Sequence, residues 1–141
     1  MAVLASPPGA RCAVLGGLAA TRLAKRGVRG AVVGGRVRDL TEMGALREWD
    51  VWAQGVSAVG AAAETKVVGV DVPVEVCGVV VRPGDVVFAD RAGGVVVVIP
   101  AEKVAQVVDE MLPSAVEADR LVAEDLKDDV ELGEALKRWR L

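Results

Sequence analysis

The chain has 141 residues, of which 52% are apolar and 3% aromatic, so one domain with a core of valine, alanine and leucine is expected over residues 1–141. A net charge of -3 argues against a nucleic-acid-binding surface, because neutralising phosphates requires a basic excess. The absence of histidine excludes a Ser-His-Asp or Cys-His nucleophile and any histidine-ligated zinc site.

The first third of the chain predicts alternating helix and strand. Residues 1–10 contain two prolines and a glycine, and we interpret them as an irregular lead-in without the basic and apolar regions of a signal peptide. Helical spacing of apolar residues predicts a helix over residues 14–26, ended by a glycine. Residues 30–33 form a short apolar run typical of a buried strand, which the next two glycines should end. A charged loop over residues 36–39 and a short helix over residues 41–47 are expected to follow.

The middle of the chain has the pattern of β-structure. Candidate strands cover residues 50–53, 67–76, 79–81, 86–89 and 95–99. Their apolar runs are continuous, which is expected when both faces of a strand are covered.

The C-terminal third, residues 101–141, is predicted to be a helical extension. An amphipathic stripe runs from Val104 to Leu112, and Pro113 is expected to break or kink that helix. Ser114 and Glu117 match a capping box at the start of a second helix. The acidic stretch that follows is interpreted as a solvated surface.

The two cysteines carry no metal-binding pattern. Cys12 and Cys77 lack the spacing of metal ligands, and we expect buried, reduced thiols in a cytoplasmic protein. No apolar run reaches the roughly 20 residues that span a bilayer, so no membrane partner is expected.

One segment has a pattern with chemical meaning. Gly16, Gly17 and Leu18 stand at a predicted helix start, whose unpaired N–H groups can hold an anion and whose glycines permit close approach. Arg38 and Asp39 follow the next strand, where α/β sheets tend to bind ligands. An arginine can bind a carboxylate with two parallel hydrogen bonds, and an aspartate can take Mg²⁺ or Mn²⁺.

Each of these features also has a purely structural interpretation. A glycine pair before a helix commonly serves packing, and an Arg-Asp pair on a loop is commonly a surface ion pair. Glu42, Glu48 and Glu64 are expected to be surface residues rather than catalytic ones.

Two long motifs resemble those of a known family. The stretch LGGLAATRLAKRGVRGAVVGGRVRDL, with its Gly17-x(20)-Arg38-Asp39 spacing, is similar to the signature of the RraA-like family. Downstream, VPVEVCGVVVRPGDVVFADRAGGVVVVIP resembles that family's second signature. The resemblance runs from about residue 10 to residue 108. The family includes the regulator of ribonuclease E activity A and the class II pyruvate aldolases acting on 4-hydroxy-4-methyl-2-oxoglutarate.

The resemblance implies a fold and an assembly. The fold would be an α/β swivelling β/β/α sandwich of the RraA-like, phosphohistidine-domain-like type with C-terminal helices. Relatives usually carry a further strand and helix before the glycine pair, so the chain is interpreted as N-terminally short. The assembly would be a homotrimer or a hexamer built from two trimers, without a nucleic-acid partner.

The resemblance also implies an activity. Arg38 would bind the substrate carboxylate, Asp39 would anchor Mg²⁺ or Mn²⁺, and backbone amides around Gly16, Gly17 and Leu18 would help to hold the 2-oxo acid. The protein would be a metal-dependent lyase, either a 4-hydroxy-4-methyl-2-oxoglutarate aldolase or an oxaloacetate decarboxylase, with an enolate stabilised by the metal. Its substrates would be pyruvate-like: pyruvate, oxaloacetate or a 4-hydroxy-2-oxo diacid. The alternative is a non-catalytic RraA-like regulator that binds a ribonuclease or another protein.

The sequence departs from the family pattern at two glycines. Aldolases of the family have an acidic residue, thought to handle a proton through a water, where Gly17 stands. Relatives usually have an aspartate at the position of Gly34, and its loss removes a carboxylate from the region before Arg38. A shortened or inactive descendant of the family is therefore a third interpretation.

Overall fold

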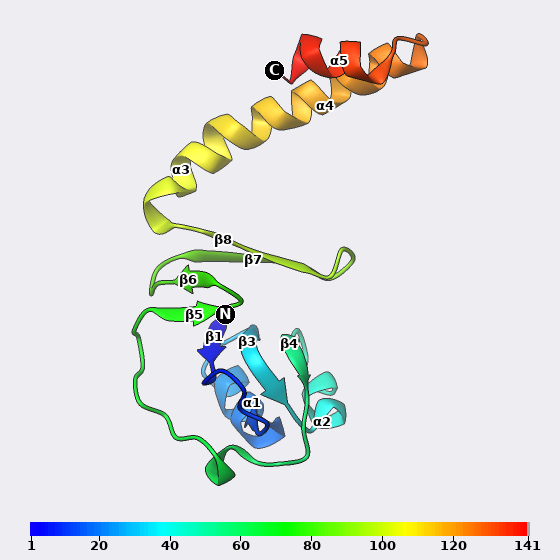
Figure 1. The fold of residues 1–141 in the computed structure, drawn as a ribbon. Coiled ribbons are helices and arrows are strands. Elements are labelled where there is room, and N and C mark those ends of the chain that lie inside the picture. Colours follow the sequence, from blue (N-terminus) through cyan, green and yellow to red (C-terminus); the bar gives the residue numbers. More distant parts are fainter. Residues whose placement is uncertain (141) are drawn as a thin grey trace. The chain divides into compact units, whose positions relative to one another are not determined.

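The computed structural model describes residues 1–140, which fall into two compact units divided between Val87 and Phe88 (Figure 1). The expectation of a single domain stays a prediction. No helix within residues 1–140 is long and apolar enough to cross a membrane.

The first unit is built on a parallel sheet whose central strand is β3 (Gly30–Val37). Strand β4 (Asp50–Val56) pairs with β3 along one edge. Strands β1 (Ala2–Ala5) and β2 (Ala13–Leu15) lie end to end along the other edge, because β1 pairs with the first half of β3 and β2 with its last residues. The carboxyl ends of β2, β3 and β4 are therefore neighbours.

Two of the predicted boundaries in this unit were wrong. The lead-in expected over residues 1–10 contains β1, whose four residues pair in parallel with residues 31–34 of β3. The strand expected to stop at Gly34 continues to Val37, because neighbouring strands on both edges keep it extended despite its two glycines. Gly34 is fixed in this strand by Ser6, whose backbone N–H and hydroxyl both donate to the Gly34 carbonyl.

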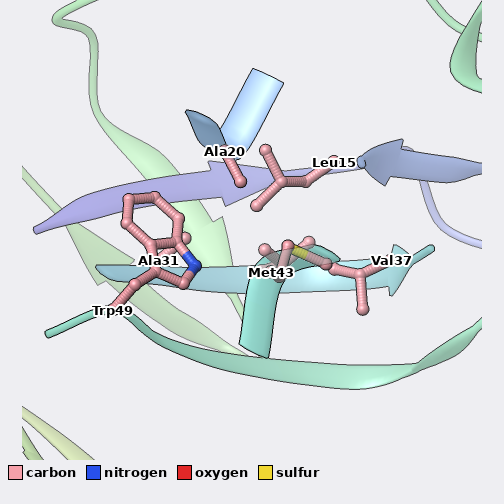
Figure 2. Close-up of a cluster of buried hydrophobic side chains, with 7 residues drawn as sticks. Leu15, Ala20, Ala31, Val37, Met43 and Trp49 are labelled. Atoms are coloured by element: carbon pink, nitrogen blue, oxygen red, sulfur yellow. The ribbon is translucent and has the colours of Figure 1, made fainter. Parts of the chain in front are cut away.

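Two short helices pack on this sheet and close the core. Helix α1 (Gly17–Lys25) follows β2, so it begins three residues later than predicted, and α2 (Leu40–Gly44) follows β3. The core cluster draws side chains from β2, α1, β3, α2 and the turn before β4, as Figure 2 shows; its buried members are Leu15, Ala20, Ala31, Val33, Val37, Met43 and Trp49.

The segment between β4 and β7 is mostly irregular. A 3-10 turn, η1 (Ala61–Ala63), precedes a hairpin of β5 (Val74–Val76) and β6 (Val79–Val81). The strand predicted over residues 67–76 forms only in its last three residues, since Val67, Val68 and Val70 have no strand partner and are exposed.

The two cysteines lie in different environments. Both thiols are free; Cys12 is buried, as expected, whereas Cys77 is exposed. Cys77 and Gly78 both adopt positive φ values, 52° and 80°, in the two-residue turn that joins β5 to β6, and this turn holds the Cys77 side chain outside the core.

The second unit contains the end of a hairpin and a helical extension. Strand β7 (Val86–Asp90) pairs with β8 (Val95–Ile99). A helical run then passes through η2 (Ala101–Lys103), α3 (Val104–Gln106), the π-helical turn η3 (Val107–Met111) and α4 (Leu112–Lys127), and α5 (Leu132–Trp139) follows.

Three predictions for this unit were wrong in detail. Pro113 does not break the helical run, which continues from α3 through the π-helical turn η3 into α4; regular α-helical pairing is instead interrupted in η3, directly before the proline, whose ring and missing N–H do not fit a regular helix interior. Ser114 is therefore inside α4 rather than at its cap, and Glu117 bonds to Arg120 instead of closing a capping box. The apolar strands β7 and β8 are not covered on both faces, since Phe88 is 59% exposed.

Candidate functional site

The parallel sheet brings the two halves of the predicted site together. Leu15 ends β2 and pairs in register with Val37, which ends β3. Gly16 and Gly17 begin α1 directly after β2, and Arg38 and Asp39 directly follow β3. The Arg38 backbone N–H donates to the Leu15 carbonyl over 3.0 Å, which fixes the two turns side by side.

Asp39 faces the start of α1. Its backbone is left-handed (φ 59°), and its Oδ2 accepts a hydrogen bond of 3.0 Å from the Gly17 backbone N–H. The same oxygen lies 3.6 Å from Nε of Arg38. The Asp39 charge is thereby stabilised by the positive end of a helix and by a guanidinium, which leaves Oδ1 for a further ligand.

The two glycines are needed for this approach. A Cβ on Gly16 would lie 2.8 Å from Asp39 Oδ2 and 3.0 Å from Arg38 Nε, closer than any side chain could be accommodated without displacing them. A Cβ on Gly17 would lie 3.3 Å from the Cβ of Asp39. The glycine pair therefore gives the Arg-Asp pair room against the helix start, as its place in the sequence suggested.

The anion cradle is partly occupied by the protein itself. Because the Gly17 N–H is bonded to Asp39, the predicted contact between that amide and a substrate stays a prediction. Among residues 1–140, nothing is found that accepts from the backbone N–H of Leu18, whose side chain is 89% exposed. Leu18 thus has an amide free to contact a ligand.

An open depression of about 620 Å³ lies beside the Arg-Asp pair. The side chains of Arg38 and Asp39 are 46% and 37% exposed, so both are accessible to a ligand. The remaining wall is mostly apolar and comes from α2 and from the end of β4; its residues are Leu40, Val56, Ser57 and Ala58.

Sequence reasoning missed the contribution of β4 to this site. Val56, Ser57 and Ala58 stand at the carboxyl end of β4, and Gly60 follows, where a Cβ would lie 3.5 Å from Arg38 Nη1. A signal was present, since residues 50–53 were predicted as the next strand along the chain after β3, and ligands gather at the carboxyl ends of parallel strands.

Asp39 fits a divalent cation as a single protein ligand. Within residues 1–140 no group of three or more histidine, cysteine, aspartate or glutamate side chains is close enough to enclose a metal ion. Mg²⁺ commonly keeps several waters and binds one or two carboxylates together with its substrate. The free Oδ1 of Asp39 beside an open depression is compatible with that mode.

The three glutamates that we predicted as surface residues have different surroundings. Glu64 accepts hydrogen bonds from the backbone N–H groups of Arg11 and Cys12, so it ties the start of β2 to the segment after η1. Glu48 pairs with Arg29. Glu42 lies in the first turn of α2, with its Cβ 3.0 Å from the position of a Cβ on Gly17.

The fold and the site together define an α/β protein with C-terminal helices and an open depression at the carboxyl ends of parallel strands. The family model described as RraA-like, Aldolase/RraA, matches residues 2–97. The chain belongs to the RraA-like family, which confirms the resemblance seen in the two motifs. This family includes both aldolase and RraA regulator members.

Two relatives illustrate the similarity in sequence. An uncharacterized protein of Methanocaldococcus jannaschii is 35% identical over 126 residues, which are 85% of this chain and 58% of the relative. A Pseudomonas syringae pv. tomato protein, provisionally named a 4-hydroxy-4-methyl-2-oxoglutarate aldolase, is 37% identical over 87 residues, which are 61% of this chain and 52% of the relative. The chain thus spans between half and three fifths of these relatives' lengths.

Two crystal structures have the same fold. An uncharacterized protein from Pseudomonas syringae pv. tomato superposes with a TM-score of 0.81 at 23% identity, covering 97% of this chain and 62% of that one. Streptomyces coelicolor RraAS2, described as an unusual member of the RNase ES inhibitor RraA protein family, gives a TM-score of 0.68 at 28% identity, covering 89% of this chain and 61% of that one. The predicted α/β fold of the RraA-like type is confirmed.

Proposed function

We propose that the protein is a divalent-metal-dependent carbon–carbon lyase acting on a 2-oxo acid, either oxaloacetate or a 4-hydroxy-2-oxo diacid such as 4-hydroxy-4-methyl-2-oxoglutarate. The proposal rests on the convergence of Arg38 and Asp39 with the start of α1 beside an open depression. Membership of a family that includes aldolases supports it.

Arg38 is suited to hold the carboxylate end of such a substrate. Its Nε faces Asp39 Oδ2, while the two terminal nitrogens of the guanidinium have no hydrogen-bond partner among the described residues. A planar guanidinium binds a carboxylate with two parallel hydrogen bonds, which would fix the orientation of the neighbouring 2-oxo group.

Asp39 would hold the divalent cation, Mg²⁺ or Mn²⁺, through Oδ1. When bound there, the ion supplies Lewis-acid polarisation of the 2-oxo group. The hydrogen bond from Gly17 and the neighbouring guanidinium hold the Asp39 carboxylate oriented for that ligand.

The same residues suit the charge that develops in either reaction. When the C3–C4 bond breaks, its electron pair moves to form a C2–C3 double bond, and negative charge gathers on the C2 oxygen. The Arg38 cation and the start of α1 would stabilise that charge in the proposed reaction. Decarboxylation and retro-aldol cleavage share this enolate, so one site can serve both.

The test measures pyruvate release from oxaloacetate with Mg²⁺ or Mn²⁺, with and without chelator. Asp39→Asn keeps an acceptor for the Gly17 N–H but removes the charge, and Arg38→Lys keeps a charge but loses the planar fork; each should lower kcat/KM by roughly 10²–10³-fold. Arg47→Ala removes an exposed arginine outside the depression and serves as the matched control. Turnover that chelator and both variants leave unchanged would refute the proposal.

A homotrimer or a hexamer remains part of the proposal. Apolar side chains of β7 and β8 are exposed in the single chain; among them are Phe88, Val95 and Val97. An assembly would cover such surface. Light scattering coupled to size exclusion tests this, and a monomer at assay concentrations would contradict it.

The second candidate is a non-catalytic regulator that binds a ribonuclease. The likeness to Streptomyces coelicolor RraAS2 supports this candidate, and a net charge of -3 suits a partner with basic segments. Absence of turnover from a well-folded chain, together with binding to a ribonuclease of that class, would favour it over the lyase.

A further inference from the structure

We propose that Glu42 is the proton-handling carboxylate of the site for retro-aldol cleavage, an inference that rests on the lyase function proposed above. Cleaving a 4-hydroxy-2-oxo acid requires that the C4 hydroxyl lose its proton as the C3–C4 bond breaks. A general base must therefore stand next to the Arg38 and Asp39 pair.

The residues already placed in the site cannot supply that base. Arg38 has no acceptor. Asp39 accepts from Gly17 through Oδ2, faces a guanidinium, and is assigned through Oδ1 to the cation. The chain has no histidine, and the hydroxyl of Ser57, which lines the depression, is a weak base that already accepts from the Val59 N–H. A second carboxylate is needed.

The stem of the Glu42 side chain lies next to the glycine turn. It lies in the first turn of α2, three residues after Asp39, and its Cβ and Cγ are 3.0 Å and 3.6 Å from the Cβ position of Gly17. The same Gly17 position is 3.3 Å from the Cβ of Asp39. Within residues 1–140 no hydrogen bond or ion pair engages the Glu42 carboxylate, unlike those of Glu48 and Glu64.

Gly17 and Glu42 occupy one space. A side chain on residue 17 would lie closer to the stem of Glu42 than side chains normally do. The glycine at position 17 therefore leaves the space that the Glu42 side chain occupies. Glu42 therefore extends from α2 through the space that a side chain on residue 17 would enter from α1, and in the proposed reaction its carboxylate would reach the Arg38 and Asp39 pair from there. Its helical position alone would suit a glutamate through the helix dipole, so the test must separate proton handling from structure.

The proton transfers balance over one turnover. Glu42 accepts the C4 hydroxyl proton, directly or through one water, while the C3–C4 electron pair forms the C2–C3 double bond of the enolate and the carbonyl product leaves. The proton then returns to C3, giving pyruvate and regenerating the carboxylate. Oxaloacetate decarboxylation has no hydroxyl proton to remove, and solvent water can protonate C3.

The difference between these two reactions gives the measurement. Pyruvate release from 4-hydroxy-4-methyl-2-oxoglutarate and from oxaloacetate is followed on the same preparations of wild type and Glu42→Gln. We expect kcat for aldol cleavage to fall about 100-fold or more with little change in KM, while decarboxylation stays within about tenfold of wild type. Glu75→Gln, an exposed isosteric change on β5, is the matched control.

A swap of the carboxylate provides the second arm. Gly17→Asp with Glu42→Gly moves the acid from α2 to α1, and Gly17→Ala with Glu42→Gly has the same backbone changes without the acid. The first double variant should cleave the 4-hydroxy acid at least about tenfold faster than the second.

The outcomes separate the two proposals. Loss of both reactions to the same extent in Glu42→Gln would make Glu42 a structural residue and overturn the inference alone. So would unchanged aldol cleavage in that variant, or a wild-type chain that decarboxylates oxaloacetate yet leaves the 4-hydroxy acid intact. A wild-type chain that turns over neither substrate overturns the lyase function itself.

Discussion

The parallel-sheet unit and the helical unit bury their apolar residues to different extents. In the first unit, buried side chains from two strands, two helices and the turn before β4 converge on one cluster, and Met43 and Val33 are each 1% exposed. In the second, Val122 and Ala135 are buried, while large apolar residues such as Phe88, Met111 and Leu112 remain more than half exposed.

The second unit is instead rich in polar contacts between its helices. Asp125 on α4 accepts from Arg138 and from the indole N–H of Trp139, both on α5, over 3.0 Å and 2.9 Å. Arg140 pairs with Asp119 over 2.7 Å. Exposed ion pairs contribute little to stability individually, so the difference between the units lies in buried apolar area.

The largest expected effect comes from removing the same side chain from each unit. Met43→Ala should lower the free energy of unfolding by about 2–5 kcal/mol, because it leaves a cavity in the cluster beneath the site. Met111→Ala should change it by no more than about 0.5 kcal/mol, because that side chain is 56% exposed. Denaturant unfolding of both variants measures the difference.

Either of two results would break this comparison. A loss of several kcal/mol in Met111→Ala would mean that the apolar surface of the second unit is covered by another copy of the chain, and its dependence on protein concentration would show this. A negligible loss in Met43→Ala would mean that the core does not hold the first unit together.

The fold of the first unit was predictable where the signal was local. Apolar spacing gave α1 and the start of β3, and turn glycines marked their ends. Two features depend instead on pairing between segments far apart in the sequence: the extension of β3 through Gly34 and Gly35, and the strand over residues 2–5. The sequence of one strand does not show which other strand it pairs with. The opposite error occurred over residues 67–73, which were predicted as a strand but are irregular. A valine-rich run without a partner strand therefore does not form a strand.

The sequence predicted which segments of the chain meet at the candidate site, but not the contacts between their residues. Parallel strands joined by a helix place their carboxyl ends together, so the approach of Arg38 and Asp39 to Gly16 and Gly17 followed from topology. The left-handed backbone of Asp39 and its bond to the Gly17 N–H join positions 22 residues apart and had no signal in the sequence. Neither did the packing of Glu42 against Gly17.

The next effect in size concerns Gly34, where relatives were expected to carry an aspartate. A Cβ there would lie 3.1 Å from both Cγ atoms of Val76 on β5, so the hairpin has taken the space of that side chain. Gly34→Asp should cost about 1–3 kcal/mol, and Gly34→Ala should cost a large part of it. Chemical denaturation of both variants gives the two values.

Val76 provides the control for that explanation. If the steric contact is responsible, Val76→Ala combined with Gly34→Ala should be more stable than the sum of the two single effects predicts. Strict additivity would show that the hairpin does not restrict residue 34. In that case the packing of the first unit would depend on its core cluster alone, and the difference in apolar burial between the two units would rest on that cluster.

The smallest effect is expected at the surface of α4, where Arg120 bonds to Glu117 and Glu124. The hydrogen bond from Arg120 lowers the pKa of Glu117 below its ordinary value of 4.5. Because the folded pKa is the lower one, the stabilisation is present above about pH 4.5 and is lost as the pH falls through the folded pKa.

Glu117→Gln should therefore lower the unfolding midpoint slightly at neutral pH and not at about pH 3. Molar salt should also remove the difference, since both side chains are exposed. A difference that persists in acid and in salt would assign the effect to helix packing rather than to charge, and the second unit would then resemble the first more than its exposed surface suggests.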